Sequence, residues 1–128
     1  MFHRDYILRL IQEFMVFLGR LMGLKDKNDP DVILLELERS FRQFLGYDSP
    51  LLESLGPDGV LAVLSAGDGG SPDQLAIAAI LFSEKAKNYA EFNNAPGEER
   101  CQRIALKLKE AVGHRPLSTA IAGLLEKV

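Results

Sequence analysis

The chain has 128 residues, of which 47% are hydrophobic and 26% charged, and its formal net charge is −3. This size and composition are typical of one globular domain and exclude a disordered chain. The acidic balance argues against a partner such as nucleic acid, whose phosphates call for a basic surface. A single cysteine, Cys101, excludes an intramolecular disulfide and favours a reducing cytoplasm.

The first predicted element is a broad amphipathic helix over residues 6–24. Arg9, Glu13 and Arg20 interrupt it at depths where a bilayer penalises charge, so we expect a soluble protein with no integral membrane segment. No small-residue cleavage site follows, which argues against a signal peptide. The apolar face is wider than packing on one neighbour requires, which predicts a central position in the fold or a homodimer through this helix. The face consists of Tyr6, Ile7, Leu10, Ile11, Phe14, Phe17, Leu18, Leu21 and Met22.

The six prolines predict where the helices begin, because proline lacks an N–H and its φ is already helical. Three follow good N-cap residues, in the pairs Asp29-Pro30, Ser49-Pro50 and Ser71-Pro72, whereas Pro57, Pro96 and Pro116 follow weaker caps. The further predicted helices therefore cover residues 30–45, 50–55, 57–65, 72–92 and 96–112, with a last helix from residue 116. Gly46 and Gly113 are the expected helix stops. Alternating strand patterns are absent from the sequence, so we predict an all-α fold.

Residues that could carry catalysis or hold a metal are sparse. His3 and His114 lie near opposite ends of the chain, and a zinc site needs three or four converging ligands. Cys101 falls on an inward helical face, which is typical of a buried, inert thiol. We therefore expect no catalytic residue, no metal and no cofactor, and a protein that is not an enzyme. An enzyme would require a pocket that brings both histidines beside an acidic group.

Two polar segments keep alternative interpretations. The glycine-rich run from Asp68 to Ser71 precedes a predicted helix and could hold an anion, but it lacks the strand and the lysine of a P-loop, so a connector is favoured. Basic residues also gather along two helices, and they form either a solvated face or a site for an acidic peptide. They are Lys85, Lys87, Arg100, Arg103, Lys107 and Lys109.

Two resemblances extend this reading. The sequences MFHRDYILRLI at residues 1–11 and LGYD at residues 45–48 resemble a family of small bacterial helical proteins of unknown function. That resemblance implies a bacterial, cytoplasmic setting and no known activity. Residues 75–112 resemble a tetratricopeptide hairpin, with Ala86 and Tyr89 at the small and aromatic positions of its first helix. Cys101, Ala105 and Leu108 match the second helix, although Ala105 stands where an aromatic residue is usual and the turn near residues 93–97 is longer.

The resemblances imply one domain in three parts. Residues 1–46 form an N-terminal helical hairpin, residues 47–70 form short helices and a loop, and residues 71–128 form a tetratricopeptide-like hairpin with a C-terminal capping helix. Because a lone repeat cannot stack on copies of itself, the N-terminal helices must cover its apolar face.

The hypothesis that follows is a non-catalytic protein-interaction or scaffold module whose partner is unknown. Helical surfaces of this kind bind peptides or partner helices through shape and a few polar contacts. Lys85, Tyr89 and Arg103 are the candidate exposed contacts for such a partner. The alternative is a binder of an apolar ligand or a membrane surface, which would use the broad face of the first helix.

Overall fold

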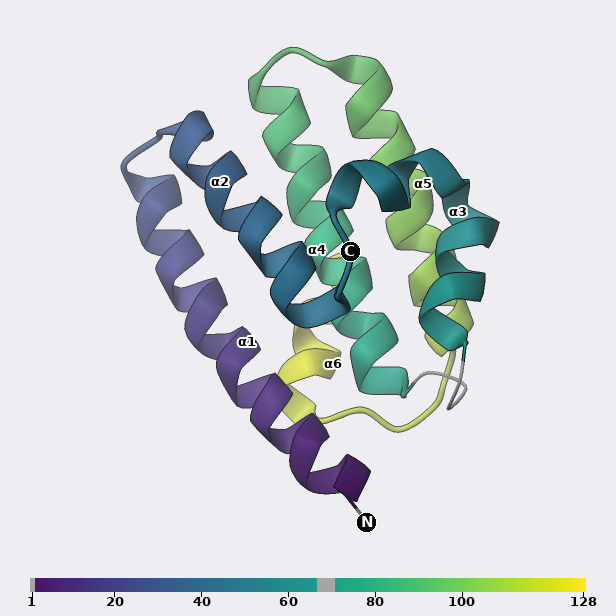
Figure 1. Ribbon diagram of the computed structural model, residues 1–128. Coiled ribbons are helices and arrows are strands. Elements are labelled where there is room, and N and C mark those ends of the chain that lie inside the picture. The colour runs from purple at the N-terminus through teal and green to yellow at the C-terminus, as the bar shows by residue number, and fades with distance from the viewer. Residues whose placement is uncertain (1, 67–70) are drawn as a thin grey trace.

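A computed structural model describes residues 2–66 and 71–128, and it confirms the all-α prediction. That part of the chain holds six α-helices, one π-helical segment and no strand. Their bounds are α1 Phe2–Asp26, α2 Pro30–Ser40, η1 Phe41–Leu45, α3 Ser49–Ser65, α4 Pro72–Glu91, α5 Ala95–Val112 and α6 Thr119–Leu125. Figure 1 shows α1 and α2 as one antiparallel pair and α4 and α5 as another, with α3 over α5 and α6 between α1 and α4.

Helix α4 is the centre of the fold. Every residue from Leu75 to Phe82 is buried, because this stretch is apolar on all sides and its alanines let neighbouring helices approach closely. It packs against α5, α2, α6, η1 and α1. The ring of Phe82 meets that of Phe41 edge to face, with centroids 4.9 Å apart. This contact packs η1, which continues α2, against α4.

Most helix starts agree with the proline pattern. The side chains of Asp29 and Ser71 cap α2 and α4 by accepting from backbone N–H groups, as predicted. Gly46 ends η1 with a φ of 82°, and Gly56 divides α3 into two helical stretches at a φ of 74°. The break at Gly56 confirms that Pro57 begins a new helical stretch.

Two predicted starts are wrong, and a competing side-chain interaction explains each. Ser49 does not cap α3; Asp48 takes that position, and the Ser49 hydroxyl instead donates to the carboxylate of Glu38. Pro116 does not begin the last helix, because α6 starts at Thr119 behind Ser118, whose hydroxyl oxygen accepts from the backbone N–H of Ile121. A capping hydroxyl outweighs an uncapped proline here.

Helix α1 lies at the edge of the molecule, so of the two alternatives that the sequence left open the central position is not the one found (Figure 1). Its core side consists of Leu10, Ile11, Phe14, Phe17 and Leu21. Tyr6 and Met22, which the sequence pattern places on the same face, are 55% and 57% exposed. Part of the apolar face of α1 is therefore not covered by other residues of the same chain. In the described residues no helix has the length and apolar character needed to cross a bilayer.

Candidate functional site

The three predicted contact residues lie in different environments. Lys85 is 4% exposed, so the expectation that it faces solvent is wrong: its ammonium group pairs with Glu38 and lies 5.2 Å from the centre of the Tyr89 ring. Tyr89 is partly buried. Arg103 is exposed, as expected, and pairs with Glu99 along α5. The structure thus brings Lys85 and Tyr89 together and leaves Arg103 apart.

Glu53, which no sequence motif marked as functional, is the hub of a buried polar network. It is 6% exposed. Its Oε1 accepts from the Tyr89 hydroxyl at 2.8 Å and from Nη2 and Nε of Arg100 at 2.9 and 3.1 Å. The Arg100 guanidinium also lies over the Tyr89 ring, 5.7 Å from its centre. The carboxylate is therefore balanced by a cation and a hydroxyl, as a buried charge requires.

The same network continues through α2. Glu38 pairs with Lys85 and accepts from the fully buried Ser49 hydroxyl at 2.8 Å, and that hydroxyl is 3.4 Å from Oε2 of Glu53. Side chains from α2, α3, α4 and α5 thus meet in one set of contacts. We call this set the closed network: Glu38, Ser49, Glu53, Lys85, Tyr89 and Arg100.

The pKa values of two groups in this region, Tyr89 and Cys101, are raised, which favours their neutral forms. Burial, with a further contribution from the hydrogen bond to Glu53, raises the pKa of Tyr89 to about 12. Burial also raises the pKa of Cys101 to about 12, and the charge of Glu53 adds to this shift. The thiol is fully buried, and the raised pKa favours its protonated form, so the environment agrees with the predicted buried thiol. The closed network is suited to holding helices together.

A different polar region lies on the other side of α4, where three hollows adjoin. One of about 350 Å³ lies near the α1–α2 turn, and one of about 260 Å³ lies between α1, α4 and α6. A third, of about 310 Å³, lies between α4, α5 and the residues after α6. Lys87 lines all three, so they lie next to one another, and we call the three hollows together the α4 groove.

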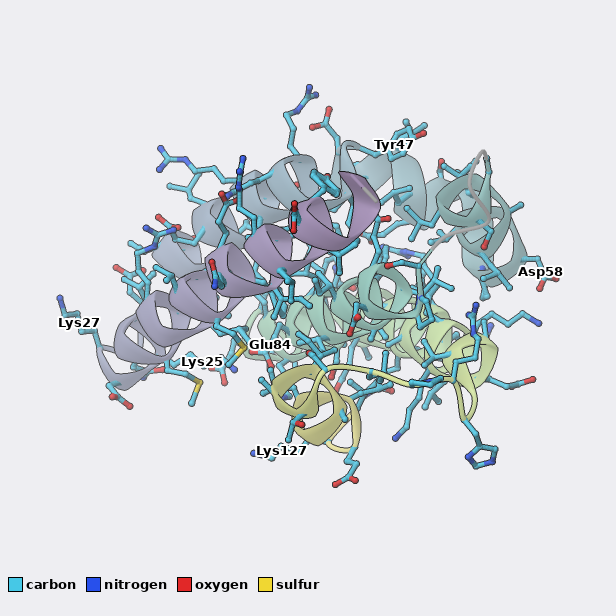
Figure 2. All side chains as sticks on the ribbon, turned by 90° about the horizontal axis from the view of Figure 1, so that it is seen from below. Lys25, Lys27, Tyr47, Asp58, Glu84 and Lys127 are labelled. Carbon is cyan, nitrogen blue, oxygen red and sulfur yellow. The ribbon has the colours of Figure 1, made fainter. Side chains whose placement is uncertain are left out.

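The lining of the α4 groove is mixed. Its aliphatic residues include Leu18, Met22, Ile33, Ile80, Ala90, Leu106, Leu124 and Val128. Its charged residues are Lys25, Glu84, Lys87, Glu91, Glu98 and Lys127. Figure 2 shows Lys25, Glu84 and Lys127 toward the same side of the molecule. Apolar walls with a few placed charges are typical of binding sites.

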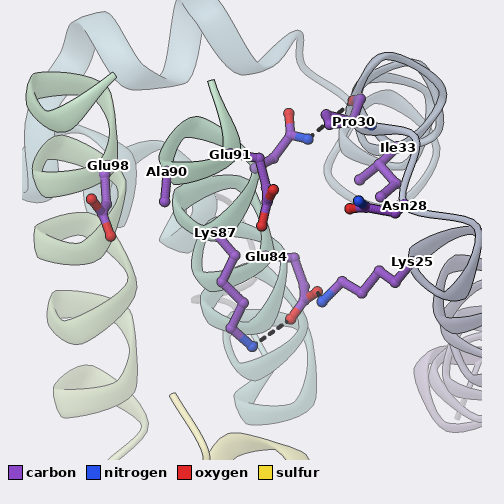
Figure 3. Close-up of a pocket in the computed structure, with 10 residues that line it drawn as sticks. Lys25, Asn28, Pro30, Ile33, Glu84, Lys87, Ala90, Glu91 and Glu98 are labelled. Atoms are coloured by element: carbon purple, nitrogen blue, oxygen red, sulfur yellow. Dashed lines mark hydrogen bonds and ion pairs between the residues drawn. The ribbon is translucent and has the colours of Figure 1, made fainter. Parts of the chain in front are cut away.

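Glu84 organises the charges at the middle of the groove. Its carboxylate pairs with the ammonium of Lys25 and accepts from Nζ of Lys87 at 2.9 Å (Figure 3). Burial raises the pKa of this carboxyl, but the hydrogen bonds and charges of the two lysines outweigh burial and leave the pKa lower than usual. One carboxylate therefore pairs with two cations.

Within residues 2–66 and 71–128, no group of three or more His, Cys, Asp and Glu side chains is placed to hold a metal ion. His114 is exposed in the turn after α5, and the side chain of His3 lies outside the described part, so their meeting is not tested. The glycine-rich run at residues 67–70 also lies outside the described residues.

Comparison with known proteins adds no relative: no family model, curated protein or solved structure matches this chain. The tetratricopeptide-like character of the α4–α5 hairpin and the bacterial family therefore stay predictions.

Proposed function

We propose that this protein is a non-catalytic interaction module whose α4 groove binds a helical segment of a partner protein. The observation that carries this proposal is that three hollows adjoin around Lys87, because a row of adjoining hollows along a helix offers places for successive side chains of a partner helix. A partner helix that lays its apolar face into such a depression is a common mode of recognition.

The dimensions support a short helix as the ligand. The groove follows α4 from Ile80 to Glu91, which at 1.5 Å per residue is about 17 Å, or about three helical turns. Leu18, Leu124 and Val128 supply aliphatic contacts near one end, and Ile33 and Ala90 supply them near the other. Apolar side chains one turn apart on the partner would match this spacing.

The charges predict the direction of the partner. Glu91 and Glu98 line the end of the groove near the α1–α2 turn, whereas Lys127 lines the two hollows toward α6. A partner with basic residues at one end and acidic residues at the other would match this polarity in one orientation. Such complementarity sets register and specificity more than affinity.

The test is a display selection of helical peptides against the full chain, followed by affinity measurements on two charge-reversal variants. Lys87→Glu changes an exposed residue of the groove, and the matched control Lys107→Glu changes a surface lysine of α5 that faces Asp58. Selected peptides are expected to bind Lys87→Glu about tenfold more weakly, a loss of about 1.4 kcal/mol, and to bind Lys107→Glu normally. Equal binding to both variants would reject the groove.

One observation favours the alternative, a binder of an apolar ligand or a membrane surface. The hollow between α1, α4 and α6 combines Leu18, Ile80 and Leu124 with the exposed Met22 of α1. Lys25, Lys87 and Lys127 line it, which suits an anionic amphiphile. Sedimentation with phosphatidylglycerol vesicles and titration with decanoate test this function: Met22→Glu should abolish any binding, and no binding by the unchanged protein removes the alternative.

A further inference from the structure

Helix α1 carries an exposed stripe on the side away from the core. Its residues recur every three or four positions, which places those from residue 5 to residue 23 on one side of α1, and Lys27 follows in the turn directly after the helix; all of them are exposed. We call this set the α1 stripe: Asp5, Arg9, Gln12, Val16, Arg20, Gly23 and Lys27. It is separate from the α4 groove, since none of these residues lines the hollows that form the groove.

The stripe is complementary to itself when a second copy is turned around. Its positions are symmetric about Val16, so a twofold axis there places residue 5 opposite residue 27. It also places residue 9 opposite residue 23 and residue 12 opposite residue 20. Asp5 then meets Lys27, the Gln12 amide meets the Arg20 guanidinium, and the long Arg9 side chain lies over Gly23. We propose that this chain forms a homodimer in which the two α1 helices pack antiparallel, with Val16 on the twofold axis.

A surface hollow lies where this arrangement needs one. It measures about 300 Å³ and lies next to Val16, with Phe17 as its apolar floor and Gln12, Glu13 and Arg20 as polar walls. Val16 is 69% exposed, the most of any large hydrophobic side chain in the described residues. In the antiparallel pair each Val16 faces its counterpart beside this hollow, and each Glu13 comes within reach of the other chain's Arg20.

The stripe residues can make these contacts without breaking strong interactions inside their own chain. Arg20 is 3.6 Å from Glu36 within its own chain, and its side chain is 58% exposed, while Glu36 also has Arg39 as a partner. A long, exposed ion pair of this kind is weak and can be exchanged. Gly23 has no atom within 4 Å of the position of an added Cβ, so packing within one chain does not require glycine there. A second helix that approaches closely would use the missing side chain.

Cysteine cross-linking of the full chain tests the geometry. Val16→Cys should oxidise to a disulfide-linked dimer, because the two positions face each other across the axis. Gly23→Cys should not cross-link to itself, since its two copies lie about 21 Å apart along the helices, but it should cross-link to Arg9→Cys in a mixture. Failure of Val16→Cys, or equal self-cross-linking of Gly23→Cys, would overturn the antiparallel pair.

Charge exchange provides a second, independent readout. In sedimentation equilibrium, Glu13→Arg and Arg20→Glu should each weaken dimerisation about tenfold, because like charges then face each other across the interface. The double variant restores opposite charges and should return to within about threefold of the unchanged chain. A double variant as weak as the single ones, or a monomeric unchanged chain, contradicts the proposal. Circular dichroism confirms that each variant is folded.

Discussion

Glu84 and Lys85 are neighbours on α4 that lie in opposite kinds of surroundings. Lys85 points into the closed network, where its charge is matched by Glu38 and covered by Tyr89. Glu84 points into the α4 groove, where one carboxylate serves two lysines beside open hollows. The difference teaches that charge alone does not mark a binding site. Charges matched inside the protein stabilise one arrangement of helices, whereas charges at the rim of an apolar hollow remain available to a partner.

The largest difference in stability between the closed network and the α4 groove should come from replacing Glu53. Glu53→Ala leaves the Tyr89 hydroxyl and the Arg100 guanidinium without their shared acceptor, and we expect a loss of about 3 kcal/mol in the free energy of unfolding. Glu84→Ala, on the groove side, leaves lysines that can reach water and should lose about 1 kcal/mol. Urea titration measures both, and equal losses would remove the distinction.

Gly97→Ala should be the next most disruptive change. A Cβ at this position would lie 2.7 Å from the Tyr89 ring, so the ring that carries the network hydroxyl has to move. We expect a loss of about 2 kcal/mol, as for other overpacked cores. The loss should shrink when Tyr89 is replaced by leucine, whose side chain is smaller. Unfolding free energies that simply add in the double variant would show that the ring is not the cause.

Alkaline pH should lower the stability of the fold through Tyr89 and Cys101, which lie at the closed network. The pKa values of Tyr89 and Cys101 are raised in the fold to about 12 from 10.0 and 9.0, so the folded state holds these protons more tightly than the unfolded state. Their contribution is complete below pH 9 and is lost as pH rises toward 12. Cys101→Ala should make stability fall less steeply between pH 9 and pH 10 in thermal unfolding; an unchanged slope would contradict this assignment.

Acidic pH should lower the stability of the fold through Glu84 in the α4 groove. The folded pKa of Glu84 is lower than its ordinary value of 4.5, so its ion pairs stabilise the fold above that pH. The contribution disappears as pH falls through the folded pKa. Glu84→Gln is expected to lower stability at pH 7 and to flatten the acid limb. If the unchanged chain and the variant lose stability in parallel below pH 4.5, Glu84 has no part in that limb.

Local signals predicted most helix bounds because proline, capping oxygens and glycine act within one turn. Apart from the start of α6, which the nearby Ser118 sets, the errors arise where a residue distant in sequence competes. Ser49 was expected to cap a helix, but Glu38 takes its hydroxyl. Lys85 was expected to be exposed because lysine usually is, yet a carboxylate 47 positions away in sequence balances it in the interior. The α4 groove could not be predicted, since its walls come from α1, α2, α4, α5, α6 and residues 127 and 128, which meet only in the fold.

The most direct test of the account compares two lysines that lie two residues apart on α4. Lys85→Ala removes a buried side chain and leaves Glu38 without its cation, whereas Lys87→Ala removes a side chain that is 58% exposed. Denaturant titration should place Lys85→Ala at least about 2 kcal/mol below the unchanged chain and Lys87→Ala within about 0.5 kcal/mol of it. Two variants of equal stability, or a less stable Lys87→Ala, would contradict the division of α4 into a closed side and an open side.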